Sequence, residues 1–126
     1  MTLLLDTQAF LWWVTDDPRL SKRARDAIAV SECLLSPASC WEMAIKASLG
    51  KLTVPRPIDR FIQGQLEVNG FGLLPISLEH TAAVADLPFH HRDPFDRLLA
   101  AQARHEAIGV VSSDPVFRKY GVKRVW

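Results

Sequence analysis

Cysteine, long apolar runs and an excess of one charge are all scarce in this sequence. Its two cysteines, Cys33 and Cys40, are too few for a disulfide scaffold. No apolar stretch approaches the roughly 20 residues that a helix needs to cross a bilayer. The start, MTLLLDTQAFLWW, lacks a basic segment, and Asp6 interrupts its apolar run, so it does not resemble a secretory signal. We therefore expect a cytoplasmic protein with free thiols and no membrane partner.

The charge balance gives no sign of a general polyanion binder. Lys and Arg number 15 and Asp and Glu 14, for a formal net charge of +1. No long-range basic field is implied, and binding to nucleic acid would need local clusters of cations. Hydrophobic residues make up 48% and charged residues 23%, as in globular proteins. At 126 residues, we expect residues 1–126 to form a single domain with its own core.

Short apolar runs alternate with helical patterns along the whole chain. The pattern predicts strands at 3–5, 33–35, 73–76, 108–111 and 123–126. It predicts helices at about 7–15, 21–30, 37–49, 58–68, 78–86, 94–107 and 115–119. Strands that are apolar throughout and separated by helices are typical of a parallel sheet covered on both faces. The expected fold class is therefore α/β, a three-layer α/β/α sandwich with a central parallel sheet of about five strands.

Several carboxylates follow the predicted strands. Asp6 ends the first strand and Asp114 follows the fourth. The helix that Asp93 and Asp96 begin leads into the fourth strand, so its start lies at the same edge of the sheet. Each acid, taken alone, is at least as well explained as a helix cap or a first-turn acid. Ligands of such sheets bind beyond the carboxyl ends of the strands, so together the acids predict a site there.

Glu42 strengthens that prediction, because it falls on the apolar side of its own predicted helix. The helix lies in SPASCWEMAIKASLGKL. Its expected apolar stripe is made of Ala38, Trp41, Ile45 and Leu49. Burying an ionised carboxylate without a partner is costly, which favours a functional reason for Glu42. The alternative is an ion pair with Lys46, four residues on, that holds Glu42 at the margin of the stripe.

Carboxylates that converge in one cleft raise each other's pKa unless a cation lies among them. Oxygen ligands without a convergent His or Cys favour Mg²⁺ or Mn²⁺ over zinc. The adjacent His90 and His91 lack a third ligand and are not interpreted as a zinc site. A hard divalent ion can lower the pKa of a bound water and stabilise charge on a phosphodiester. Metal-dependent phosphodiester hydrolysis is therefore the expected reaction class.

Four blocks of this sequence resemble, in order and spacing, the signature blocks of PIN-domain ribonucleases. They are LLLDTQAFLWW, SPASCWEMAIKASLGKL, HHRDPFDRLLAAQA and VVSSDPVFRKYGV, and they are most similar to those of VapC toxins from type II toxin–antitoxin pairs. The likeness covers essentially the whole chain, and DPFDRLLAAQA is its most specific part. It implies an acidic Mg²⁺ or Mn²⁺ site and endonucleolytic cleavage of RNA by a metal-bound water. It also implies a homodimer and an antitoxin protein that blocks the site.

The resemblance also assigns residues by position. Its catalytic and metal-binding acids fall on Asp6, Glu42, Asp96 and Asp114. Supporting roles fall on Asp93 and Ser112. The local cations predicted to bind RNA are Lys46, Arg92 and Arg97, with Lys51, His91, Arg118 and Lys119 as weaker candidates. For most of these cations a solvated surface charge is the ordinary explanation.

Two further points stay open on the sequence alone. A catalytically inactive PIN-like binding module is the alternative function, although the full acidic set argues against it. The stretch AFLWWV, residues 9–14, is more apolar than one buried helix face requires. Most of it is expected in the core, and an exposed part would be a partner surface.

Overall fold

A five-stranded parallel sheet forms the centre of the protein, and all 126 residues are described in the computed structural model. The strand order is β3-β2-β1-β4-β5. The strands are β1 (Thr2–Leu5), β2 (Glu32–Leu35), β3 (Gly72–Leu73), β4 (Gly109–Val111) and β5 (Arg124–Val125). In the register of the middle strands, Leu5 of β1 lies beside Leu35 of β2 and Val111 of β4. The predicted parallel sheet is confirmed, although β3 is shorter than the predicted 73–76 strand.

The predicted helices are also present, with ends that differ by one or two residues. They are α1 (Thr7–Val14), α2 (Lys22–Val30), α3 (Pro37–Ser48), α4 (Ile58–Asn69), α5 (Leu78–Ala83), α6 (Pro94–Glu106) and α7 (Val116–Lys119). The predicted helix 78–86 is divided, because a 3₁₀ turn, η1 (Val84–Asp86), follows α5. No helix is both long enough and apolar enough to cross a membrane. Both cysteines are free, as expected.

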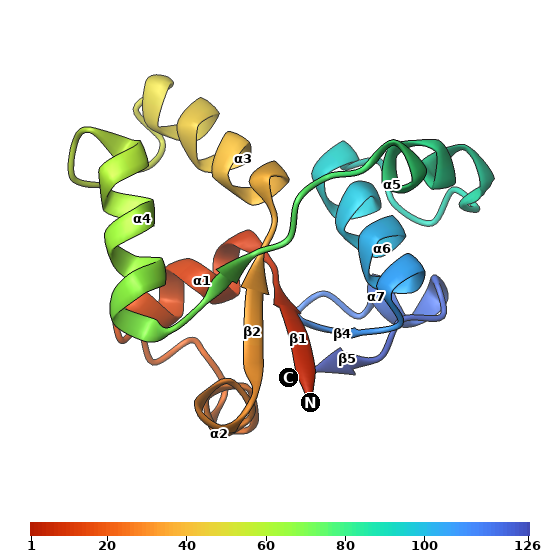
Figure 1. Cartoon of the computed structure of the whole chain (residues 1–126), viewed down its shortest axis with the longest axis horizontal. Helices are drawn as coiled ribbons and strands as arrows, with labels where there is room; N and C mark the ends of the chain where they lie inside the picture. The colour runs from red at the N-terminus through yellow and green to blue at the C-terminus, as the bar shows by residue number, and fades with distance from the viewer.

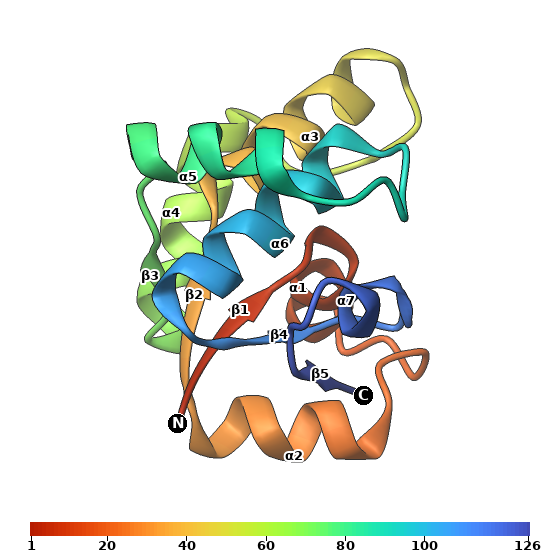
Figure 2. The same cartoon turned by 90° about the vertical axis from the view of Figure 1, so that its right-hand side faces the viewer.

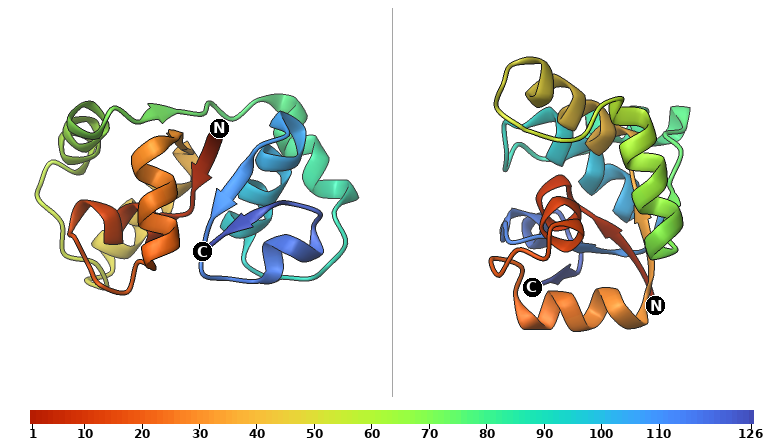
Figure 3. Two further views of the ribbon diagram at one scale, coloured as in Figure 1. Left: turned by 90° about the horizontal axis from the view of Figure 1, so that it is seen from below. Right: turned by 90° about the vertical axis from the view of Figure 1, so that its left-hand side faces the viewer.

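Helices cover both faces of the sheet, which confirms the three-layer architecture. Alternate residues of β1 point to opposite faces, as in any strand. Leu3 and Leu5 pack with α1, α2 and α4, whereas Leu4 packs with α6 and α7, and all three leucines are fully buried. The two groups of helices lie on opposite sides in Figures 1 and 3. Helix α3 contributes Met43 to the first cluster and Ala38 to the second.

The aromatic run in α1 belongs to the core. Phe10 is fully buried, and Trp12 and Trp13 are partly buried against the same cluster. The Trp13 Nε1 donates a hydrogen bond of 2.9 Å to Asn69 Oδ1 in α4. The Trp12 ring lies 5.8 Å from the ring of Trp126. Packing therefore accounts for most of the run, as expected, while Trp12, Trp13 and Val14 stay half-buried.

The predicted apolar stripe of α3 is wrong at Trp41 and Leu49, whereas Ala38 is buried as predicted. Trp41 is 64% exposed and Leu49 62% exposed. The buried face is made of Ala38, Ser39, Met43 and Ala47. Most of these side chains are small, which lets α3 pack closely against α1 and α6. Close helix packing outweighed the burial of the larger apolar side chains.

Candidate active site

Asp6 and Asp114 lie at the ends of neighbouring parallel strands, as the sequence predicted. Asp6 follows β1 and is the N-cap of α1, where its Oδ1 accepts a hydrogen bond of 2.7 Å from the backbone N–H of Ala9. Asp114 follows β4, and its Oδ1 accepts a 2.9 Å hydrogen bond from the N–H of Val116. Since β1 and β4 are adjacent, the two carboxylates share one edge of the sheet.

The start of α6 brings two more acids to this edge. Asp93 is the N-cap, and its Oδ1 accepts hydrogen bonds from the N–H groups of Phe95 (2.8 Å) and Asp96 (3.3 Å). Asp96 lies in the first turn. In Figure 2 the ribbon of α6 runs back from the side where β1 ends to the start of β4. The arrangement that the sequence predicted for Asp96 and Asp114 is therefore present.

His91 links these acids, a contact that sequence reasoning missed. Its Nδ1 accepts a 3.0 Å hydrogen bond from the backbone N–H of Asp93, so the ring proton must be on Nε2. That Nε2 lies 3.1 Å from Asp96 Oδ2 and 3.2 Å from Asp114 Oδ2. His91 thus donates toward both carboxylates. The only sequence signal for this role was its position two residues before the N-cap.

Glu42 lies at the margin of the same group and is held by two neighbours. Its Oε1 accepts a 2.7 Å hydrogen bond from the Thr7 hydroxyl, and its Oε2 lies 2.7 Å from Lys46 Nζ. The ion pair with Lys46, which was the alternative interpretation of Glu42, is therefore present. It does not remove Glu42 from the site, because the Glu42 side chain is only 12% exposed and its charge acts on Asp6 and Asp96. Thr7 was not predicted.

Burial of Asp6 raises its pKa from 3.8 to about 6. The charges of Glu42 and Asp114 contribute a smaller part of this rise, while hydrogen bonds from Ser112 and from the N–H of Ala9 oppose it. Ser112 is fully buried, and its hydroxyl also accepts a 3.0 Å hydrogen bond from the N–H of Asp114. Ser112 therefore connects the carboxylates that follow β1 and β4.

Asp96 shows the same effect more strongly. Its burial, together with the charges of Asp93, Asp6 and Glu42, raises the pKa of Asp96 to about 7, and His91 opposes the rise. Both carboxyl groups therefore ionise at a higher pH than an ordinary Asp does. A divalent cation would relieve that repulsion, and every acid here offers oxygen, the ligand atom that Mg²⁺ and Mn²⁺ prefer.

The prediction that Arg97 binds RNA is wrong. Arg97 is only 7% exposed, and its guanidinium is used inside the protein. Nη1 donates to the carbonyl of Pro88 (3.0 Å) and to the Tyr120 hydroxyl (3.3 Å). Nη2 donates to the carbonyls of Val84 (3.3 Å) and Leu87 (3.4 Å). Arg97 anchors the segment before α6, and little of its guanidinium is left to reach a phosphate. Arg92, by contrast, is exposed beside Asp93.

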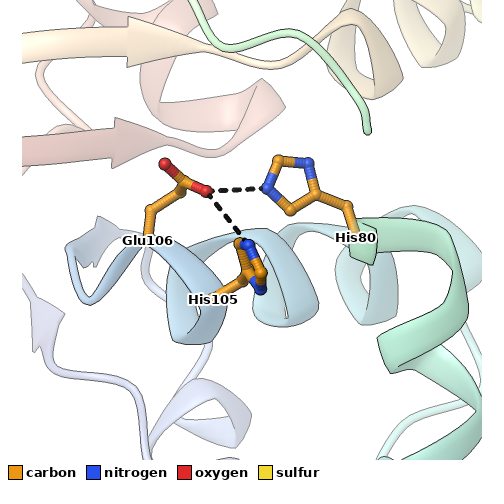
Figure 4. A group of neighbouring side chains, drawn as sticks. All are labelled: His80, His105 and Glu106. Carbon is orange, nitrogen blue, oxygen red and sulfur yellow. Dashed lines mark hydrogen bonds and ion pairs between the residues drawn. The ribbon is translucent and has the colours of Figure 1, made fainter. Parts of the chain in front are cut away.

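A second cluster of ionisable side chains lies away from the sheet edge (Figure 4). Glu106 Oε2 lies 3.0 Å from His80 Nε2 and 3.8 Å from His105 Nε2. His80 is the N3 residue of a capping box, and its Nδ1 accepts a 3.0 Å hydrogen bond from the N–H of Ser77. His80 Nε2 therefore carries the proton and donates to Glu106, so it has no free lone pair for a metal. This cluster connects α5 to the end of α6.

A fully parallel α/β/α sheet with acids converging at its carboxyl edge defines the class of protein. Residues 3–123 match the model of the PIN domain family, and the chain belongs to this family. It is 31% identical over 121 residues to Ribonuclease VapC22 of Mycobacterium tuberculosis, with 94% of this chain and 92% of the relative covered. The predicted likeness to PIN-domain VapC proteins is thereby confirmed.

Solved structures share the fold at low sequence identity. VapBC from Salmonella typhimurium, crystallised with DNA, matches with a TM-score of 0.71 at 15% identity, covering 98% of this chain and 96% of that one. FitAB bound to a DNA fragment gives 0.68 at 19% identity, with coverages of 97% and 92%. VapBC2 from Rickettsia felis, bound to a DNA fragment from its promoter, gives 0.66 at 16% identity and covers both chains fully.

Proposed function

We propose that this chain is a Mg²⁺- or Mn²⁺-dependent endoribonuclease and the toxin of a type II toxin–antitoxin pair. The observation that carries the proposal is the convergence of Asp6, Glu42, Asp96 and Asp114 at one edge of the sheet. Their mutual repulsion and burial raise the pKa of Asp6 and Asp96. Carboxyl groups with strongly raised pKa values cluster at functional sites. The similarity to Ribonuclease VapC22 supports RNA as the substrate.

The donor set fits a hard divalent ion. Asp6, Asp96 and Asp114 are the proposed direct ligands, and Glu42 completes the acidic set. The carboxylates have fixed orientations because backbone N–H groups hold one oxygen each of Asp6 and Asp114. Thr7 and Lys46 do the same for Glu42. Ligands that are oriented in this way by neighbours bind metal more tightly than free ones.

The bound ion would supply Lewis acidity, lowering the pKa of a water and offsetting charge on the scissile phosphate. The chain's own residues hold the acids in place and orient them. Asp93 and Ser112 are proposed to support the acids, Asp93 by capping α6 and Ser112 by hydrogen bonding near Asp6 and Asp114. The Nε2–H of His91 donates to Asp96 and Asp114 and limits the orientations that these carboxylates adopt. No protein nucleophile is required.

We also propose a homodimer and a cognate antitoxin as partners. A structure of the same fold, a toxin–antitoxin complex from Klebsiella pneumoniae, supports the antitoxin. An exposed apolar groove of about 310 Å³, lined in part by Trp41, Val84, Phe95 and Leu98, offers a surface for a protein partner. Sedimentation of the purified chain over a range of concentrations tests the dimer, and a single monomer mass at every concentration would contradict it.

The proposal is tested by cleavage of a mixed pool of structured RNA. Purified protein is assayed with Mn²⁺, with Mg²⁺ and with EDTA, beside Asp6→Asn and the matched control Asp59→Asn. Asp59 is an exposed acid in the first turn of α4, outside the site. We expect metal-dependent cutting by the wild type and the control, and none by Asp6→Asn. Cutting that persists in EDTA and in Asp6→Asn would come from a contaminant, and the preparation would be repurified before the result is read.

The alternative, a catalytically inactive PIN-like binding module, predicts a different result. The wild type would then be as inert as Asp6→Asn and would bind no Mn²⁺. A Mn²⁺ titration by calorimetry separates the two functions independently of the RNA chosen. Saturable binding that is lost in Glu42→Gln supports the nuclease, whereas no binding by the wild type supports the module.

A further inference from the structure

A cleft of about 750 Å³ opens beside the acidic edge. One wall is the segment before α6, with Phe89, His90 and Arg92, and the other is the segment around α7, including Lys119. Asp114 lines the cleft as well and belongs to the proposed metal site. Figure 2 shows the two segments on the same side of the molecule. The cleft is therefore continuous with the place where a scissile phosphate would lie.

Phe89 is an unusual surface residue, because it is 90% exposed although it is large and apolar. It is nevertheless supported from behind. The guanidinium carbon of Arg97 lies 4.4 Å from the centre of the Phe89 ring. That guanidinium is itself fixed by the carbonyls of Pro88 and Leu87 and by other internal acceptors. The Arg97 guanidinium therefore holds the Phe89 ring through a cation–π contact, while most of the Phe89 side chain stays exposed.

The charges of this cleft suit a polyanion. Arg92 and Lys119 are exposed and stand on opposite walls. Neither takes part in an ion pair within the protein, unlike Lys46, Arg19 or Lys22. His90 lines the same cleft, with its ring 5.3 Å from the Tyr120 ring. The near-neutral total charge of the chain therefore hides a local cluster of cations beside the acids.

We propose that this cleft binds the single-stranded RNA segment next to the scissile phosphate, with a base stacked on Phe89 and phosphates paired with Arg92 and Lys119. The inference rests on the proposed ribonuclease function and names the part of the chain that holds its substrate. Open aromatic rings combined with cations are how proteins bind single strands without reading sequence. Bases of a duplex are already stacked on each other, so a single strand is the form that fits.

RNA suits this cleft better than a protein segment does. A protein partner favours an extensive apolar surface with few charges at its centre. Apart from Phe89, the side chains that line this cleft are mostly charged or polar. The apolar groove at Trp41 has the opposite character. Phosphates also supply the negative charge that unpaired Arg92 and Lys119 lack.

The test measures binding by fluorescence anisotropy with a fluorescein-labelled pool of 20-nucleotide single-stranded RNAs of random sequence. All variants carry Asp6→Asn and the buffer contains EDTA, so that the probe stays intact. Phe89→Leu removes stacking but keeps an apolar side chain, and Phe89→Tyr restores the aromatic ring. Arg92→Gln and Lys119→Gln each remove one charge. The controls are Leu78→Ala, 80% exposed on α5, and Arg23→Gln, exposed on α2 on the other face of the sheet.

The two kinds of contact have different signatures. Phe89→Leu is expected to weaken binding roughly 5- to 100-fold without changing its salt dependence, because stacking carries no charge. Phe89→Tyr should remain within about two-fold of the parent, because an aromatic ring still stacks. Arg92→Gln and Lys119→Gln should each weaken binding and reduce the slope of log K against log salt by about 0.7. Both controls should bind as the parent does.

Equal binding by the cleft variants and the controls would overturn the inference, as would a Phe89→Tyr protein that binds as weakly as Phe89→Leu. Cleavage by the otherwise wild-type chain in Mn²⁺ is measured in parallel. Normal cleavage together with unaffected binding would contradict the proposed role of the cleft and support the nuclease. Binding that depends on Phe89 and Lys119 without any cleavage would contradict the nuclease and support the role of the cleft in RNA binding. A wild type that neither binds nor cuts the RNA would contradict both.

Discussion

Replacement of Asp6 by Asn is expected to stabilise the metal-free protein near pH 7.5 while it abolishes the response to divalent ions. Burial raises the pKa of Asp6 to about 6 from 3.8. A pKa unit corresponds to about 1.4 kcal/mol, so the ionised carboxylate lowers the free energy of unfolding by at most about 3 kcal/mol. Asn caps a helix as well as Asp does, so the hydrogen bond to Ala9 is retained. A gain of about 1–3 kcal/mol is expected, or roughly 3–10 °C in Tm.

The gain should depend on pH in a defined direction. The folded-state pKa of Asp6 lies above its unfolded value of 3.8, so folding favours the protonated form. The contribution of the protonated Asp6 side chain to the free energy of unfolding is fully present below about pH 4. It is lost as the pH rises through about 6. Asp96 adds a similar loss around pH 7. The difference in Tm between Asp6→Asn and wild type should therefore be near zero at pH 4 and largest above pH 7.

Thermal unfolding in EDTA from pH 4 to pH 8 checks this expectation, and added Mn²⁺ gives the second half of the test. A ligand that binds only the folded state raises Tm, so Mn²⁺ should stabilise the wild type and leave Asp6→Asn unchanged. Asp59→Asn is the matched control and should stay within about 0.5 kcal/mol of wild type. A metal-free Asp6→Asn protein that is less stable than wild type at every pH would refute the electrostatic reasoning.

Three further predictions concern other parts of the structure. Thr7→Val removes the hydrogen bond to Glu42. It should weaken Mn²⁺ binding about 10-fold by calorimetry, whereas Thr7→Ser should not. Arg97→Met leaves buried carbonyls without donors. It should lower the free energy of unfolding in urea by about 2–4 kcal/mol, and an unchanged midpoint would contradict the anchoring role. Burial raises the pKa of the Cys33 thiol to about 11 and also raises that of Cys40. Both should react with a disulfide reagent at pH 8 at least about 10-fold faster in denaturant than in the native state.

The fold could be predicted because its strands are short and apolar on both faces. Leu3, Leu4 and Leu5 leave no polar face, so only a sheet covered on both sides can bury them. Caps such as Asp93 followed by Pro94 marked where helices begin. The pattern failed in α3, where Trp41 is exposed. Which face of a helix is buried there depends on how closely its neighbours approach, and the hydrophobic pattern does not contain that distance.

The candidate site was predictable where topology alone decides position. Asp6 and Asp114 follow adjacent parallel strands, and this suffices to bring them together. The roles of His91 and Arg97 were not predictable in the same way. Both are basic residues near DPFD in the sequence, yet one donates to two acids and the other is buried among carbonyls. The path of the segment before α6 makes that difference, and the local sequence does not encode it in a recognisable pattern.

Helix capping and metal binding are not competing explanations for these acids. A carboxylate has two oxygens, and a cap uses one of them. Asp6 and Asp114 each present Oδ1 to a backbone N–H at the start of a helical segment. The second oxygen takes no part in the cap, and in Asp114 this Oδ2 lies 3.2 Å from His91 Nε2. Because parallel strands end at one edge and the next helices begin there, a fold of this type collects its capping acids in one place. Only Glu42 and Asp96 lie inside their helices, and these two therefore carry the stronger evidence for function.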